Sequence, residues 1–326
     1  MTIPASIIIP VYNGEATIEN CILSLLNQSM PADTYEIIVV DDGSTDSTGD
    51  VVGKFAGSKN LKYIHQKNSG PSAARNCGVE AASGEIVLFI DADCEASFNW
   101  IEEMLRPFKD AGVAGVKGVY TSRQKEIIAR LVQLEYEDKY NRMKRFPSID
   151  FIDTYACGYR RKVFRQAGGF DNSFPTASVE DQEFSFRIAK KGHKLVFNPK
   201  ASVRHLHAAS LGNYLRKKYK IGYWKVLVLK KHPEKMVSDS HTPQLLKFQM
   251  VLAPVVIISG LYKFVCGGRL FFELSLLSYL LTSTPFILFS SGKDIVVSII
   301  SPAVFYLRSL ALLSGMIKGF FILGKQ

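Results

Sequence analysis

The feature that most constrains the fold of this chain is a run of five apolar residues, Ile86 to Ile90. Two carboxylates, Asp91 and Asp93, follow the run directly. The run is too short for a typical helix and is bounded by turn residues, which predicts a strand buried on both faces. Ligands of open α/β sheets bind beyond the carboxyl ends of the strands, so both carboxylates are expected at a ligand site. Two neighbouring carboxylates repel unless a cation or a proton compensates them, and such oxygen ligands suit Mg²⁺ or Mn²⁺. The alternative is that one of them caps a helix predicted to begin near Ser97.

The chain before this run alternates between predicted strands and helices. Strands are expected at residues 5–10, 36–40 and 61–64, and helices at residues 15–28 and 70–82. This alternation favours an α/β fold with a mostly parallel, doubly wound sheet and flanking helices. The strand ends would then bring Asn13, Asp41, Asp42 and Asp91 to one edge of the sheet. Each could be a turn residue for local hydrogen-bonding reasons, but acidic groups at several strand ends would repel one another unless a ligand used them.

Four ordered segments, residues 6–14, 40–46, 74–78 and 89–93, closely resemble the motifs of family 2 glycosyltransferases, which have the Rossmann-like GT-A fold. The resemblance covers about residues 5–205 and implies a nucleotide-sugar site made of Pro10, Tyr12, Asn13, Asp41, Asp42, Arg75, Asp91, Ala92 and Asp93. It implies that Asp42 and the first-strand loop hold the base and ribose, and that Asp93 of the DxD motif binds Mn²⁺ or Mg²⁺ on the diphosphate. Such a metal neutralises the charge that develops on the leaving diphosphate. Arg75 would lie near the nucleotide, although it could instead be a surface residue of its helix.

A fifth motif is the acidic pair Glu180 and Asp181. It precedes Phe184 and Ile188, which are spaced as on one helical face, so both acids are expected in the first turn of a helix. The helix dipole alone would favour acidic residues there. The resemblance implies that Asp181, with Glu180 beside it, is the general base. It would deprotonate a hydroxyl acceptor on the face opposite the departing diphosphate, so that the anomeric configuration inverts.

Two further regions are assigned by the resemblance. A small-residue turn at residues 155–161 is expected on the acceptor side, with Cys157, Gly158 and Tyr159 as its candidate residues. His205, after a strand predicted at residues 194–197, is a second candidate metal ligand, because some family members have a histidine that approaches the metal. A structural hydrogen bond or a role as an exposed interface residue is the alternative for His205. A charged helix at residues 124–145 is expected to present a solvated face and is assigned no chemistry.

The composition changes after about residue 240. The chain carries a net charge of +10, and between residues 200 and 235 ten lysines and arginines face only Glu234. A basic belt of this kind before hydrophobic segments predicts contact with anionic membrane headgroups, and no nucleic-acid-binding module is recognisable. Hydrophobic segments follow at residues 248–266, 270–290 and 295–323, each about long enough to cross a bilayer. The predicted organisation is a GT-A domain over residues 1–210, a basic juxtamembrane region over 211–244 and all-helical membrane-associated segments over 245–326.

The membrane topology stays open. Three full crossings would put Lys263 and Arg269 on the far side of the membrane, which the positive-inside rule disfavours. Re-entrant or interfacial helices would remove this conflict.

These features predict a membrane-bound, metal-dependent, inverting glycosyltransferase whose catalytic domain faces the cytoplasm, where nucleotide sugars are made. It would transfer one sugar from a nucleotide-sugar donor to an acceptor at the membrane surface, most simply a polyprenyl-linked saccharide. One alternative is a polyprenyl-phosphate sugar synthase, in which Arg160, Arg161, Arg216 and Lys217 would neutralise a phosphate acceptor. The other is a catalytically silent membrane scaffold, although such a protein would have no physical need to keep clustered carboxylates.

Overall fold

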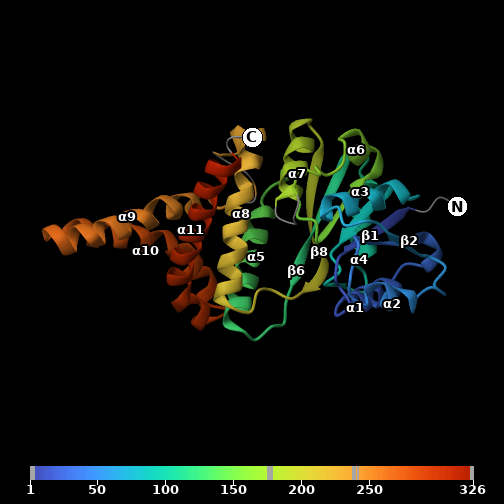
Figure 1. Ribbon diagram of the computed structural model, residues 1–326, viewed down its shortest axis with the longest axis horizontal. Helices are drawn as coiled ribbons and strands as arrows, with labels where there is room; N and C mark the ends of the chain where they lie inside the picture. Colours follow the sequence, from blue (N-terminus) through green and yellow to red (C-terminus); the bar gives the residue numbers. More distant parts are fainter. Residues whose placement is uncertain (1–3, 175–178, 237–239, 241, 324–326) are drawn as a thin grey trace. The chain divides into compact units, whose positions relative to one another are not determined.

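A computed structural model describes residues 4–174, 179–236, 240 and 242–323, and the chain forms two compact units (Figure 1). The first unit comprises Met1–Ser122 and Arg142–Leu206, and the second comprises Arg123–Asn141 and His207–Gln326. Helix α5 (Ile127–Met143), which the sequence places inside the GT-A domain, therefore belongs mostly to the second unit with the C-terminal helices.

The first unit is built on one eight-stranded sheet with the order β3-β2-β1-β4-β7-β6-β8-β5. The strands are β1 (Ala5–Val11), β2 (Tyr35–Asp41), β3 (Leu61–His65), β4 (Ile86–Ile90), β5 (Cys94–Ala96), β6 (Val113–Thr121), β7 (Ala156–Arg160) and β8 (Lys194–His205). Strands β3, β2, β1 and β4 run parallel, as predicted. Strand β7 is antiparallel to both β4 and β6, and β5 is antiparallel to β8, so the sheet is mixed. All five residues of β4 are buried, which confirms the strand that the apolar run predicts.

The helices of the first unit include the two that the sequence predicts at residues 15–28 and 70–82. They are α1 (Ile18–Leu26), α2 (Thr48–Gly53), α3 (Pro71–Ala81), α4 (Trp100–Leu105), α6 (Arg161–Gln166) and α7 (Glu180–Lys190), with short 3₁₀ turns η1 (Ala32–Thr34) and η2 (Arg106–Lys109). Helix α3 packs directly on β1, because a Cβ at Gly78 would lie only 2.5 Å from Cγ2 of Ile8. This close approach holds the helix that carries Arg75 and Asn76 against the centre of the sheet.

The second unit is helical. It contains α5, α8 (Leu211–Lys231), η3 (Pro233–Met236), α9 (Gln244–Cys266), α10 (Arg269–Ser291) and α11 (Ile295–Leu323). The last three helices are long and apolar enough to cross a membrane, as the sequence predicts. Helices α9 and α10 lie side by side, while α11 packs along α8 (Figure 1). Leu131 of α5, Tyr214 of α8 and Val297 and Phe305 of α11 meet in one apolar core.

A buried polar cluster joins four helices of this unit, α5, α8, α9 and α11. Arg308 of α11 donates to the Glu135 carboxylate of α5 and, at 2.6 Å, to Oε1 of Gln249 on α9. The Tyr214 hydroxyl donates to the same carboxylate at 2.9 Å. Glu135 is therefore not part of a solvated face of α5, because only 15% of its side chain is exposed and Arg308 pairs with it.

Candidate active site

The two carboxylates after β4 lie where the apolar run predicts. The Asp91 carbonyl accepts a hydrogen bond from the Cys94 amide at 3.0 Å, and β5 begins at Cys94. Helix α4 begins only at Trp100, after Asn99, so neither Asp91 nor Asp93 caps it. Asp91 is partly buried, whereas about half of the Asp93 side chain is exposed. The Asp93 carboxylate is therefore accessible to a ligand.

Asp93, Cys94 and His205 form a possible metal site, with one ligand atom of each within 4.8 Å of the others. Pairing of β5 with β8 sets Cys94 opposite His205, whose Nδ1 lies 3.4 Å from Oδ1 of Asp93. Burial would raise the pKa of Asp93, but the hydrogen bond and charge of His205 hold it below its ordinary value. Burial and the charges of Asp91 and Asp93 raise the pKa of the Cys94 thiol well above its ordinary value. The Asp93 carboxylate and the His205 ring are oxygen and nitrogen ligands that could hold a divalent metal ion.

Arg75 is not a surface residue, because only 3% of it is exposed. Its guanidinium donates to Oδ1 of Asp91 at 3.0 Å and to Oε1 of Glu180 at 2.9 Å. The guanidinium also lies 5.8 Å from the centre of the Phe170 ring. Arg75 thus connects the end of β4 to the start of α7, and these contacts use two of its nitrogens on protein carboxylates.

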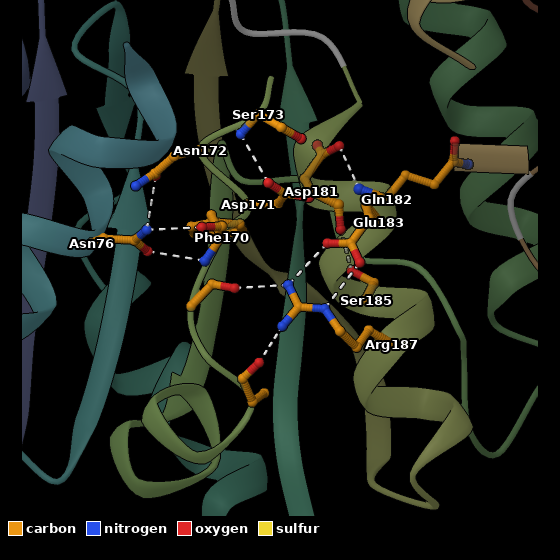
Figure 2. Close-up of polar contacts among 12 residues, drawn as sticks. Asn76, Phe170, Asp171, Asn172, Ser173, Asp181, Gln182, Glu183, Ser185 and Arg187 are labelled. Carbon is orange, nitrogen blue, oxygen red and sulfur yellow. Dashed lines mark hydrogen bonds and ion pairs between the residues drawn. The ribbon is translucent and has the colours of Figure 1, made fainter. Parts of the chain in front are cut away.

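Glu180 and Asp181 lie in the first turn of α7, as predicted, but their surroundings differ. Glu180 is buried against Arg75, whereas Asp181 accepts a hydrogen bond from the Gln182 amide at 2.7 Å (Figure 2). Burial and the neighbouring Glu180 charge raise the pKa of Asp181 to about 7, against the opposing charge of Arg75. A carboxylate with a pKa near neutrality can accept a proton efficiently, which is the property that a general base needs.

Side chains from two helices, α3 and α7, hydrogen-bond to the turn before α7 (Figure 2). Asn76 of α3 exchanges two hydrogen bonds with the backbone of Phe170, at 2.8 and 2.9 Å. Arg187 of α7 donates to the Gly169 carbonyl at 2.8 Å and pairs with Glu183. Gly169 has φ of +67°, and a Cβ there would lie 2.6 Å from Oδ1 of Asn76, so glycine is required. The Gly-Gly-Phe segment therefore positions α7 relative to α3.

Lys117 of β6 is a site residue that the sequence analysis does not include. Its side chain is fully buried, forms an ion pair with Asp153 and donates to the Tyr155 hydroxyl at 3.1 Å. Burial lowers the pKa of Lys117 to about 7, and the Asp181 charge opposes that shift. Lys117 in turn lowers the pKa of Asp181. A single lysine inside an otherwise apolar strand was the available signal.

The predicted nucleotide loops lie at the carboxyl ends of β1 and β2. The Asn13 side chain accepts a hydrogen bond from the Thr45 amide at 2.8 Å, which joins the two loops. Asp41 accepts from the Tyr63 hydroxyl at 2.6 Å and from the Ser44 amide at 2.8 Å. Asp42 is buried and binds the backbone amides of Ser69 and Gly70 at 2.9 and 2.8 Å. These carboxylates shape the rim of the sheet edge, where Tyr12 is exposed.

The turn predicted at residues 155–161 is wrong, because Ala156–Arg160 form strand β7. Cys157 and Tyr159 are fully buried, and Gly158 pairs with Leu88 in β4. The Tyr159 ring packs on Phe184 at 5.1 Å in an aromatic core, which leaves these side chains no exposed surface for an acceptor. Small residues occur here because the sheet packs closely: a Cβ at Gly158 would lie 2.4 Å from Cδ2 of Leu88.

Arg160 and Arg161 lie at the opposite end of this part of the sheet. Arg160 pairs in register with Ile86, at the start of β4, whereas the site carboxylates follow its end. Its guanidinium donates to the Val113 and Phe108 carbonyls, both at 2.8 Å, and Arg161 donates to the Ala82 carbonyl at 2.6 Å. Neither arginine faces the carboxylate edge.

Comparison with known proteins agrees with this arrangement. A family model described as glycosyl transferase family 2 matches residues 6–168. Glycosyltransferase AglE of Haloferax volcanii is 31% identical over 235 residues, which cover 70% of this chain and 75% of that protein. The putative glycosyltransferase EpsH of Bacillus subtilis is 46% identical over 203 residues, and the match spans 57% of this chain and 56% of that relative.

Solved structures show the same fold. The mannosyltransferase PcManGT from Pyrobaculum calidifontis, crystallised with GDP-Man and Mn²⁺, aligns with a TM-score of 0.65 at 17% identity over 97% of this chain and 87% of that chain. GalNAc-T7, crystallised with UDP, GalNAc and Mn²⁺, aligns with a TM-score of 0.51 at 18% identity over 76% and 53% of the two chains. The sheet, the family match and the curated relatives together establish that this chain belongs to glycosyltransferase family 2 and has the GT-A fold.

Proposed function

We propose that this protein is a metal-dependent, inverting glycosyltransferase that moves one sugar from a nucleotide-sugar donor to an acceptor hydroxyl at a membrane surface. The observation that carries this proposal is the connection of Asp91, Arg75 and Glu180, which places the base candidate Asp181 next to a fixed charge network. A carboxylate in this network whose pKa is raised to about 7 supports an enzyme rather than a scaffold.

The chemistry assigned to Asp181 is proton transfer. The acceptor oxygen attacks the anomeric carbon, the carbon–oxygen bond to the diphosphate breaks, and the acceptor proton passes to the Asp181 carboxylate. A base near its pKa at neutral pH typically contributes a factor of about 10²–10⁴ to the rate. Arg75 then has the role of a positioning residue, which holds Glu180 and through it the first turn of α7.

Donor binding is proposed for the carboxyl edge of β1, β2 and β4. Asp93 and His205 would hold Mn²⁺, which would act as a Lewis acid on the diphosphate. Asn13, Asp41, Asp42 and the exposed Tyr12 would contact the base and ribose, together with the backbone at Pro10 and Ala92. The bound ligands of the Pyrobaculum mannosyltransferase, GDP-Man and Mn²⁺, support a donor and a metal of these classes.

The acceptor is proposed to be a polyprenyl-linked saccharide, reached from the cytoplasmic face of the cell membrane. The three apolar helices and the basic α8 support membrane attachment. A phosphate acceptor is the weaker candidate, because Arg160 and Arg161 are engaged with backbone carbonyls at the other end of β4. No part of the proposed function involves nucleic acid.

The test is label transfer by the purified full-length protein in lipid, with a panel of radiolabelled nucleotide sugars and extracted polyprenyl-linked acceptors. Each donor is assayed with Mn²⁺, with Mg²⁺ and with a chelator, beside Asp93→Ala and Asp181→Asn. We expect Mn²⁺-dependent label in the organic phase, lost in both variants. Label only in water-soluble products would refute the lipid acceptor, and absence of metal-dependent donor binding would favour the scaffold. An anomeric configuration retained in the product would refute the inverting mechanism.

A further inference from the structure

A hollow of about 360 Å³ lies on the second unit between α8 and α11. It is lined by Tyr219, Lys220 and Tyr223 of α8 and by Lys318 and Ile322 of α11. Lys220 and Lys318 are exposed, whereas the two tyrosines are partly buried. We call it the α8–α11 hollow; it combines two ammonium groups and two phenol rings with one aliphatic side chain.

Close contact between the two helix backbones forms the walls of the hollow. A Cβ at Gly315 would lie 2.1 Å from the Tyr219 carbonyl oxygen, and a Cβ at Gly319 would lie 2.4 Å from that of Tyr223. Any larger residue at either glycine would push α11 away from α8. The helix contact therefore fixes the backbone positions of the residues that line the hollow.

The positive charge of the hollow is not neutralised by the part of the chain that the structure describes. Within residues 4–174, 179–236, 240 and 242–323, neither Lys220 nor Lys318 makes a hydrogen bond or an ion pair. Nearby lysines of α8 do have partners: Lys218 lies 3.5 Å from the Glu135 carboxylate, and Lys230 donates to the Leu323 carbonyl at 2.9 Å. Two ammonium groups and two phenols can all donate to the oxygens of a phosphate ester.

The helices and side chains next to α11 indicate where the hollow lies relative to the bilayer. A helix of 29 residues is about 43 Å long, enough to cross a hydrocarbon core of about 30 Å. Yet the charged helix α8 lies beside α11 along most of its length, up to the contact of Lys230 with Leu323, and charged side chains are costly inside a bilayer. Phe320 and Phe321 of the same segment are exposed. A helix pair with a basic side and an apolar side belongs at the membrane surface, where headgroups lie.

We propose that the α8–α11 hollow binds the phosphate headgroup of an anionic phospholipid and so anchors the helical unit at the membrane surface. This inference rests on the proposed membrane attachment and adds to it one defined lipid site. It separates the lysines of α8 into two classes. Lys220 acts together with Lys318 on one headgroup, whereas Lys217 and Lys231 are not among the residues that line the hollow.

Trp224 provides a local probe, because its ring lies 5.0 Å from that of Tyr223 in the wall of the hollow. Trp100, the second of the two tryptophans, is fully buried in the first unit and gives a constant background. The full-length protein is reconstituted in vesicles of phosphatidylcholine and phosphatidylglycerol of one fixed composition. The bromine that quenches tryptophan fluorescence is carried on the acyl chains of either lipid, so the surface charge stays identical.

We expect brominated phosphatidylglycerol to quench Trp224 at about thirtyfold lower mole fraction than brominated phosphatidylcholine, since two lysines near an anionic surface contribute about 1 kcal/mol each. Lys220→Gln/Lys318→Gln should abolish this preference, whereas the control Lys217→Gln/Lys231→Gln, which removes the same charge from α8, should keep it. If both double variants lose the lipid preference equally, or if the two lipids quench the unmodified protein equally, the lipid site in the hollow is refuted. The proposed membrane attachment is not affected by either result. Quenching by neither lipid would overturn both. Loss of the preference on adding inorganic phosphate at matched ionic strength would assign the hollow to a soluble anion instead.

Discussion

Arg75 and Glu180 lie 105 residues apart in the chain, yet their side chains form an almost fully buried ion pair of 2.9 Å. The same guanidinium reaches Asp91 at 3.0 Å, so one cation holds the end of β4 and the start of α7 together. The position of the base candidate Asp181 therefore depends on a residue that is itself shielded from solvent.

Replacing Arg75 by Met should leave Asp91 and Glu180 as buried charges without their partner. Removing one side of a buried ion pair typically costs about 3–5 kcal/mol, and we expect a loss of that size in denaturant unfolding of the catalytic unit followed by circular dichroism. The control is Arg165→Met, which removes a solvent-exposed pair with Glu80 and should change the free energy of unfolding far less than Arg75→Met. Equal effects of the two variants would contradict the assigned role of Arg75.

The pH profile of activity should report Asp181. Its pKa is raised to about 7, so the carboxylate is the active form only above that pH, and kcat should fall about tenfold per unit below it. Asp181→Asn should lower kcat by about 10²–10⁴ and remove this acid limb. Steady-state rates between pH 5 and 9 measure both effects, and an unchanged acid limb in the variant would exclude Asp181 as the titrating group.

Lys117 should shift that profile without contacting the acceptor. Its positive charge lowers the pKa of Asp181, so Lys117→Met should raise that pKa and move the acid limb to higher pH, by up to about one unit. Lys194→Met removes an exposed charge of the first unit that pairs with Asp110, and it should leave the limb in place. A shift toward lower pH in Lys117→Met would reverse the sign of the interaction and refute it.

The metal requirement should depend on His205. With Nδ1 of His205 3.4 Å from the Asp93 carboxylate, His205→Ala should raise the Mn²⁺ concentration for half-maximal activity by about tenfold or more. His193→Ala, which removes a histidine at the start of β8, should not. Manganese binding followed by electron paramagnetic resonance gives the same comparison without turnover, and identical affinities in both variants would leave His205 a structural residue.

Replacing two different glycines of α8 by alanine should change the stability of the helical unit in opposite directions. Gly222→Ala would set a Cβ 2.2 Å from the Leu312 carbonyl oxygen and should destabilise the helical unit by about 1–3 kcal/mol. Gly212→Ala meets nothing within 4 Å and should stabilise it by about 0.4–1 kcal/mol. Thermal unfolding in detergent measures both, and stabilisation by both would show that the helices separate easily.

The elements that the sequence predicts well are those with a local signal. The run from Ile86 to Ile90 is buried at every position, and its length together with the following carboxylates is enough to identify β4. The first turn of α7 is equally visible, because Phe184 and Ile188 follow Glu180 at helical spacing.

The features that the sequence does not reveal depend on partners far along the chain. Strand β7 contains Cys157 and Gly158, small residues typical of a turn, and becomes a strand because β4 and β6 lie on both sides. Glu135 appears solvated until Arg308 is placed against it. The burial of Lys117 in an apolar strand is explained only by its partners Asp153 and Tyr155, which bind its ammonium group.

The assignment of α5 to the helical unit has a consequence for how this protein can be shortened. Ile128, Leu131 and Leu134 of α5 are covered by Tyr214, Val297 and neighbouring apolar residues of α8, α10 and α11. Truncation after residue 206 would retain α5 but strip its apolar side, since the helix is encoded between two segments of the first unit. A catalytic fragment produced that way should aggregate or require detergent, and its solubility would depend on substituting polar residues on α5 rather than on moving the end point.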